Sequence, residues 1–289
     1  MKKMTEEERL GKEAAERVLA RSGKKKEEVE KEENERQQSF LVEGNKGSHI
    51  KHVIAVMSGK GGVGKSYVTA SLANCLKNKG FKVGILDADI TGPSIPKLFG
   101  VKGPAYAVEE GSYPVESKGG IKIMSINLIL PDEETPVIWR GPVIAGAVKQ
   151  FWTDVIWGEL DYLLIDMPPG TGDVPLTVFQ SFPVEGIVLV TSPQQLVSMI
   201  VNKARNMASM MGIRIIGIIE NMSYFECKKC GERYEIFGKS DIDKVSGAAN
   251  IPVLARLPID PSVAESCDRG EVESLSDDEF EKAVGAIIL

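Results

Sequence analysis

The sequence predicts a doubly wound α/β fold, in which helices cover both faces of a mostly parallel β-sheet. Short runs rich in valine and isoleucine recur from His52 onward, and helical stretches separate them. These runs are apolar at consecutive positions, as strands covered on both faces must be. The repeated order of strand, helix and strand predicts parallel strands joined by right-handed crossovers.

The predicted strands, in chain order, are HVIAVM, KVGILD, IKIMSI, YLLID, GIVLVTS, IRIIGIIE and IPVLARL. Helices are expected over residues 66–79, 142–157 and 196–211. The segment 100–120 is rich in Gly, Pro and Tyr, so it is expected to leave the sheet. The C-terminal sequence SDDEFEKAVGAIIL predicts a helix that packs on the core and exposes an acidic face.

Residues 1–49 are interpreted as a charged extension that is flexible or partly helical, and residues 50–289 as the folded domain. The extension has no continuous apolar stripe, so it reads either as a solubilising tail or as a contact arm for a partner. The net charge of -6 argues against nucleic-acid and anionic-membrane partners. With four cysteines and no apolar run of about 18 residues, the expected location is cytoplasmic, with reduced thiols.

A phosphate-binding loop is predicted between the first strand and the first helix. The sequence GKGGVGKS fits the pattern G-x-x-x-x-G-K-[ST] in the context that this pattern requires. Its glycines let backbone N–H groups approach phosphates, Lys65 would reach the β- and γ-phosphates, and Ser66 would ligate Mg²⁺. The residues of this segment expected to contact ATP are Gly59, Lys60, Gly61, Gly62, Val63, Gly64, Lys65, Ser66 and Tyr67.

Three carboxylates follow predicted strands and should meet at the same crevice, since ligands bind at the carboxyl ends of parallel strands. Asp166 ends YLLID and is expected near the Mg²⁺ site. Asp87 and Asp89 follow the second strand, and Asp89 is expected to orient the attacking water. Either of the latter two carboxylates could instead cap the following turn.

The second lysine of the loop, Lys60, is not needed for its own nucleotide because Lys65 already serves the phosphates. Lys60 could instead reach the nucleotide of a second copy as a catalytic cation, which would require a homodimer, and the resemblance to a known family described below implies this role. The alternative is a solvated lysine.

Cys227 and Cys230 form a C-x-x-C pair in a segment that inserts at 221–238. Such a pair can form a redox disulfide, half of a zinc site or half of an iron–sulfur site. Neither Cys75 nor Cys267 has a second cysteine nearby in sequence. A symmetric dimer would bring two pairs together and supply four thiolates.

Several motifs together resemble one family of proteins. They are MSGKGGVGKS, LDADITGPSIP, WRGP, DYLLIDMPPGTGD, TSPQQ, ENMSYFECKKCGERYEIFG and LPIDPSV. The loop resembles the deviant Walker A group of P-loop NTPases, which includes MinD and ParA, and the whole set resembles the Mrp/ApbC/Nbp family of ATP-binding iron–sulfur cluster carriers. The resemblance implies a slow ATPase whose homodimer holds a [4Fe–4S] cluster between paired cysteines and exchanges it with scaffold proteins and apo-proteins.

The resemblance also implies roles for individual residues. Asn221 should contact adenine with Pro258 nearby, and Gly170 and Gly172 should sense the γ-phosphate. Tyr67 stands where the family usually has a threonine that contacts the α-phosphate, which puts nucleotide affinity and turnover in doubt. The N-terminal segment has no cysteine, so the second cluster of the Nbp branch is not expected.

Three other functions stay open from the sequence. A positioning ATPase of the MinD/ParA kind would recruit partners without iron, but the acidic C-terminal helix and the net charge argue against a membrane or DNA partner. A zinc ion could take the same four thiolates as a structural clasp at the dimer axis. A small-molecule kinase would need an acceptor site and a lid, for which the sequence gives no sign.

Overall fold

The computed structural model describes residues 41–90, 92–129, 141–193, 197–276 and 278–288. The chain divides into two compact units, Met1–Leu41 and Val42–Leu289, and every element below belongs to the second. Most of the predicted N-terminal extension, and parts of the WRGP and TSPQQ motifs, lie outside the described residues.

The second unit is built on a nine-stranded sheet with the order β10-β9-β8-β1-β7-β2-β6-β5, and β11 pairs with β9. Neighbouring strands run parallel except for the short pairs β5–β6 and β9–β10. The strands are β1 (Ser48–Ser58), β2 (Val83–Asp87), β5 (Val115–Glu116), β6 (Lys122–Met124), β7 (Gly158–Asp166), β8 (Gly186–Thr191), β9 (Arg214–Glu226), β10 (Arg233–Tyr234) and β11 (Val253–Pro258). This is the predicted doubly wound α/β fold, and the prediction is confirmed.

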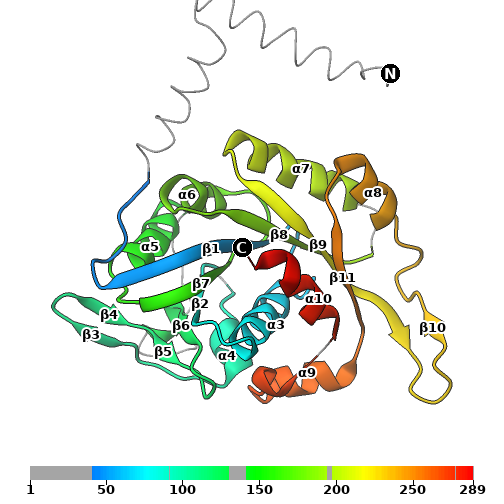
Figure 1. Cartoon of the computed structure of the whole chain (residues 1–289), viewed down its shortest axis with the longest axis horizontal. Coiled ribbons are helices and arrows are strands. Elements are labelled where there is room, and N and C mark those ends of the chain that lie inside the picture. The colour runs from blue at the N-terminus through cyan, green and yellow to red at the C-terminus, as the bar shows by residue number, and fades with distance from the viewer. Residues whose placement is uncertain (1–40, 91, 130–140, 194–196, 277, 289) are drawn as a thin grey trace, which may run out of the picture. The chain divides into compact units, whose positions relative to one another are not determined.

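Helices cover both faces of the sheet (Figure 1). One face carries α5 (Gly141–Thr153), α6 (Asp173–Ser181), α7 (Val197–Met210) and α8 (Ile242–Ala249). The other face carries α3 (Lys65–Asn78), α4 (Ile95–Phe99) and α10 (Asp278–Ile287), while α9 (Pro261–Asp268) follows β11. As predicted, α10 packs on the core, and it buries Phe280, Ala283, Val284 and Ile287.

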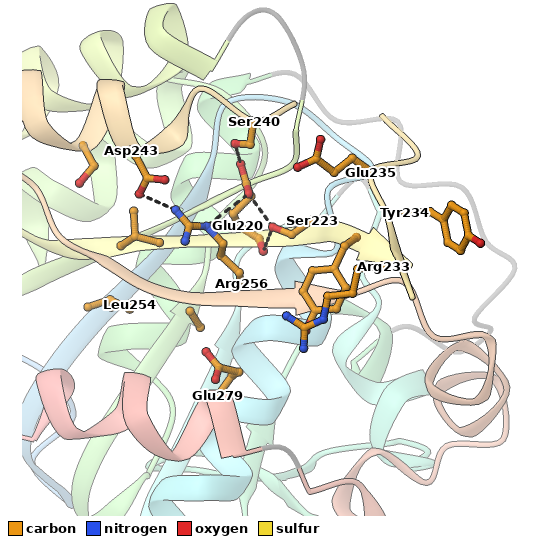
Figure 2. A pocket seen from close by; sticks show the side chains of 14 residues that line it. Glu220, Ser223, Arg233, Tyr234, Glu235, Ser240, Asp243, Leu254, Arg256 and Glu279 are labelled. Atoms are coloured by element: carbon orange, nitrogen blue, oxygen red, sulfur yellow. Dashed lines mark hydrogen bonds and ion pairs between the residues drawn. The ribbon is translucent and has the colours of Figure 1, made fainter. Parts of the chain in front are cut away.

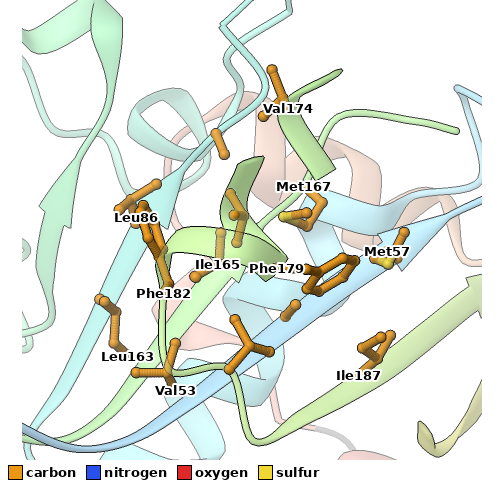
Figure 3. Packing of buried hydrophobic residues seen from close by; sticks show 14 of the residues in the cluster. Val53, Met57, Leu86, Leu163, Ile165, Met167, Val174, Phe179, Phe182 and Ile187 are labelled. Atoms are coloured by element: carbon orange, nitrogen blue, oxygen red, sulfur yellow. The ribbon is translucent and has the colours of Figure 1, made fainter. Parts of the chain in front are cut away.

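The core consists of two layers because the side chains of each strand alternate between the faces. In β1, Val53 and Met57 point to the layer under α5, α6 and α7, whereas Ile54 and Val56 point to the layer under α3. Figure 3 shows the first layer, where Phe179 and Phe182 lie among aliphatic side chains of the central strands. Burial on both faces explains why the strands read as continuous apolar runs.

Two details differ from the sequence-based expectation. The predicted helix over 142–157 ends at Thr153, because the chain then pairs with the excursion: Val155 bridges to Ser112, and Ile156 donates to the Ser112 carbonyl at 2.9 Å. The segment 100–120 leaves the sheet only in part: it forms a separate hairpin of β3 (Tyr106–Val108) and β4 (Gly111–Tyr113), but β5 then returns to the sheet beside β6. The short turn η1 (Ile126–Leu128) follows β6. The helical turn η2 (Val272–Ser274) precedes α10.

The register of the central strands sets the position of the site. Asp87, the last residue of β2, is paired in register with Asp166, the last residue of β7. Val56 near the end of β1 is also paired with Asp166. The phosphate-loop sequence and both acids therefore meet at one edge of the sheet.

Candidate functional site

The segment between β1 and α3 forms a tight loop that leads directly into the helix N-terminus. Gly62 and Gly64 have φ angles of 79° and 80°, in the left-handed region that glycine adopts without strain. A Cβ on Gly64 would lie 2.2 Å from Nδ2 of Asn221, so close approach as well as backbone conformation requires glycine there. The positive end of the α3 dipole faces this loop, as anion-binding loops require.

The first residues of α3 form a buried polar cluster with Asp166. Lys65 Nζ lies 2.7 Å from Asp166 Oδ2, and the two side chains are 6% and 0% exposed. Ser66 donates its hydroxyl to Asp166 Oδ2 at 2.6 Å, and Thr69 donates to Oδ1 at 2.7 Å. The carboxylate thus gathers a cation and two hydroxyls around itself.

This donor set fits a magnesium–nucleotide complex. The Ser66 hydroxyl and the Asp166 carboxylate are hard oxygen donors, which Mg²⁺ prefers, and Lys65 is a cation suited to phosphate. Among the described residues no three or more His, Cys, Asp or Glu side chains gather as a metal site. A bound Mg²⁺ would therefore need phosphate oxygens and water to complete its shell.

Asp87 accepts hydrogen bonds from the turn that follows β2, the capping role that the sequence left open for it. It is fully buried and accepts hydrogen bonds from the backbone N–H groups of Asp89 at 3.2 Å and Ile95 at 3.3 Å, and from the Ser125 hydroxyl at 3.1 Å. Burial, and next the charge of Asp166, raise the pKa of Asp87 to about 8, although Lys65 opposes the shift. Asp87 thereby holds the segment that carries Asp89.

The side chains of Lys60 and Asp89 are both partly exposed at this edge of the sheet. The Lys60 carbonyl accepts a hydrogen bond from the Ser58 hydroxyl at 3.0 Å, which fixes the start of the loop. Gly170, with a φ of 88°, donates its N–H to the Ser58 carbonyl at 2.8 Å. The Gly170 N–H could donate to a γ-phosphate only if its hydrogen bond to the Ser58 carbonyl broke. Gly172 precedes α6 as its N-cap.

The residues expected around adenine lie on β9 and β11. Asn221 donates to the Val63 carbonyl of the phosphate loop at 2.9 Å and accepts from the Met222 N–H at 2.9 Å. Its amide is thus engaged with the loop itself. Pro258 ends β11 and is paired in register with Tyr224 on β9.

The Tyr67 ring is directed to the helix layer. It packs edge-on against Phe280 of α10, with 5.7 Å between the ring centroids. Tyr67, which stands where the resemblance leads us to expect threonine, therefore packs against the helix layer.

The cysteine pair lies on a hairpin that projects from the end of β9 (Figure 1). Cys227 is half-buried and Cys230 is exposed, and the Cys227 carbonyl accepts from the Gly231 N–H at 2.8 Å. The backbone N–H groups of Lys229 and Cys230, together with the Cys230 thiol, hold the pKa of Cys227 below its usual value. Both side chains thus reach solvent, and the lowered pKa favours the thiolate form of Cys227 over that of an ordinary cysteine.

A polar groove of about 1040 Å³ lies beside the hairpin, and the sequence analysis assigned no role to it. Figure 2 shows Glu220 at its base, with Ser223, Ser240 and Arg256 directed toward its carboxylate. The one signal in the sequence was an acid at the end of the apolar run IRIIGIIE. Thr69 and Ser125 were missed as well, because hydroxyls carry no distinctive pattern.

Comparisons of the sequence with a family model and with curated proteins point to the same family. The model for the NUBPL iron-transfer P-loop NTPase, of the ParA group, matches residues 49–288. An iron–sulfur cluster carrier protein of Methanocaldococcus jannaschii is 50% identical over 252 residues, which covers 83% of this chain and 85% of that protein. The cytosolic Fe–S cluster assembly factor CFD1 of Kluyveromyces lactis is 43% identical over 238 residues, covering 79% of this chain and 84% of that protein.

Solved structures agree on the fold. A nucleotide-binding protein of Archaeoglobus fulgidus, in complex with ADP and with cobalt found, is 47% identical, with a TM-score of 0.73 and coverage of 80% of this chain and 91% of that chain. The cell division ATPase MinD of Pyrococcus furiosus, at 23% identity and a TM-score of 0.60, covers 82% of this chain and 98% of its own and shares the fold. Within the described residues, no helix is long and apolar enough to cross a membrane.

Proposed function

The chain belongs to the family of NUBPL-type iron-transfer P-loop NTPases, and from this membership and the site geometry we propose that it is an ATP-dependent carrier of iron–sulfur clusters. Two copies would share one [4Fe–4S] cluster as cargo. They would receive it from scaffold proteins and pass it to apo-proteins in the cytoplasm. The proposed ATPase domain, residues 50–289, lies within the compact unit Val42–Leu289, and the charged segment that precedes this unit would be an extension.

The observation that carries the proposal is the composition of the cysteine hairpin. Cys227 and Cys230 are accessible, yet within the described residues they have no third or fourth protein ligand. A [4Fe–4S] cluster and a structural zinc ion are each held by four protein ligands, so one chain supplies half of a site. A second copy related by a two-fold axis supplies the other half.

The phosphate site supports the nucleotide half of the proposal. Lys65 would exchange its contact with Asp166 for the β- and γ-phosphates, while Ser66 and Asp166 hold the Mg²⁺ that offsets phosphate charge. The nucleotide would lie along the loop residues 59–66, with Asn221 and Pro258 toward the adenine.

Hydrolysis would use residues from both copies. Asp89, whose backbone N–H is bound by Asp87, would orient a water molecule toward the γ-phosphorus. The bond between the γ-phosphorus and the β,γ-bridging oxygen would break, and that oxygen would leave with ADP. Lys60 of each copy would stabilise the charge on the other copy's phosphates. Gly170 would leave the Ser58 carbonyl to contact the γ-phosphate, which couples the nucleotide state to the dimer surface.

Anaerobic reconstitution with iron and sulfide tests this function. We expect about two irons and two sulfides per chain, the content of one shared cluster. Cys227→Ala should abolish the iron, whereas Cys267→Ala, a substitution of the same kind outside the hairpin, should retain it. Protein that takes up no iron under these conditions would contradict the proposal, and zinc binding in a separate titration would then favour a structural metal clasp.

A further inference from the structure

Glu220 lies at the point where the cysteine segment leaves the sheet. Its side chain is buried, with no exposed surface, although most of its neighbours on β9 are apolar. The carboxylate accepts a hydrogen bond from the Ser223 hydroxyl at 2.5 Å and another from the Ser240 hydroxyl, and Arg256 Nε lies 3.9 Å away (Figure 2). Arg256 is in turn paired with Asp243 on α8.

The two serines lie on opposite sides of the cysteine segment in the sequence. Ser223 precedes Cys227, and Ser240 follows Cys230. The hairpin between them is held by the pairing of β9 with β10 and by the bond from the Cys227 N–H to the Glu232 carbonyl at 2.9 Å. One buried carboxylate therefore closes the base of a segment that carries both thiols.

The next residue along β9 binds the phosphate loop. Asn221 donates to the Val63 carbonyl, while Met222 takes a φ of 58°, a left-handed conformation that is uncommon for residues other than glycine. Alternation along the strand sends Glu220 and Asn221 to opposite faces. Asn221, which contacts the phosphate loop, and Glu220, which contacts the cysteine segment, are thus consecutive residues joined by one peptide bond.

We propose that Glu220 is a positioning residue that couples the phosphate loop to the cysteine pair. A nucleotide that shifts the loop at Val63 moves Asn221, and the carboxylate beside it carries that movement through Ser223 and Ser240 to both ends of the cysteine segment. The inference rests on the proposed function for its purpose, since a carrier must hold or release its cargo according to the nucleotide.

Substitution Glu220→Gln isolates this role. Glutamine keeps the volume and one acceptor oxygen, but it places an NH₂ group where a second hydroxyl donates. One serine therefore exchanges a charge-assisted bond to a carboxylate for a weaker bond accepted from the NH₂ group, which loosens one end of the segment. Glu226→Gln is the matched control, because Glu226 lies on the same strand and closer to Cys227, yet its carboxylate pairs with exposed Arg233 at 2.7 Å.

The experiment measures the alkylation rates of Cys227 and Cys230 in the full, reduced, metal-free chain by peptide-resolved mass spectrometry, with and without Mg·ADP. In the unsubstituted protein we expect ADP to change these rates by at least about fivefold, the lower end of ordinary coupling between sites. In Glu220→Gln the ADP effect should fall below about twofold while the ADP affinity stays within about threefold. Glu226→Gln should retain the full effect.

Two results would overturn the inference: no ADP effect on either thiol in the unsubstituted protein, or the same effect in the Glu220→Gln and Glu226→Gln variants. If Glu220→Gln does not fold, Ser240→Ala removes one end of the contact and keeps the carboxylate with Ser223. A full ADP effect in that variant would equally refute the coupling. The thiol rates need no cluster, so failure to bind iron would count against the proposed function and leave this result intact.

Discussion

The pair of Lys65 and Asp166 offers a direct test of the phosphate site through its effect on stability. In Asp166→Asn the side chain keeps its shape and can still accept from Ser66 or Thr69, but the charge is lost. Lys65, only 6% exposed, then has no carboxylate at 2.7 Å. The substitution therefore leaves the buried cation without the carboxylate that it contacts, and Asp87, whose charged form burial disfavours, remains as a nearby carboxyl group.

The expected magnitude follows from that burial. Removing one partner of a buried ion pair costs about 3–5 kcal/mol, because the remaining charge has neither water nor a counter-ion. The amide recovers part of this through its hydrogen bonds, so we expect the free energy of unfolding to fall by about 3 kcal/mol. Mg·ADP should restore part of the loss, since its phosphates offer Lys65 a new anion.

Urea unfolding of the nucleotide-free protein measures the effect, with Asp161→Asn as the control on the same strand. Asp161 pairs with Lys51 at 2.7 Å, but the Lys51 side chain is 62% exposed, so water screens the pair and the loss should be much smaller. Equal losses in the two variants, or a loss below about 1 kcal/mol for Asp166→Asn, would refute the buried pair as the organising contact of the site.

Three further predictions concern other parts of the site. Gly64→Ala should weaken ADP binding by at least about tenfold in calorimetry, since a side chain at a φ of 80° is strained. The control Gly146→Ala, where a Cβ has open space, should leave the ADP affinity unchanged. Equal ADP affinities of the two variants would contradict the loop geometry. Tyr67→Thr should tighten ADP binding while lowering the thermal midpoint, because the ring leaves α10; weaker binding would show that the ring itself contacts nucleotide. In the metal-free protein, the alkylation rate of Cys227 should rise at a lower pH than that of Cys267. Hydrogen bonds to the thiolate lower the pKa of Cys227, whereas burial raises the pKa of Cys267. More thiolate, the reactive form, is present at a given pH when the pKa is lower. The reverse order would contradict the hairpin geometry.

The fold could be predicted from the sequence because the physics that forms it is local and repeated. Strands buried on both faces must be apolar throughout, so each of the seven predicted runs appears as a strand of the sheet. The end of α5 at Thr153 could not be predicted, since the bridge that follows it joins Val155 to Ser112, a residue that is distant in sequence.

The same distinction holds for the site. The glycine pattern and Lys65 identify a phosphate loop because few other structures require that spacing. The raised pKa of Asp87 follows from its burial and from the charge of Asp166, which lies on a strand that is distant in sequence. The role of Glu220 depends on Ser240, which follows it only after the whole cysteine hairpin. Contacts of this kind become visible only in the folded chain.

Native mass spectrometry of the anaerobically reconstituted protein tests most directly whether two chains share one cluster through Cys227 and Cys230. The account predicts a dimer whose excess mass equals one [4Fe–4S] cluster, and its loss in Cys230→Ala. A monomer that carries its own cluster, or a Cys230→Ala dimer that still carries one, would contradict it.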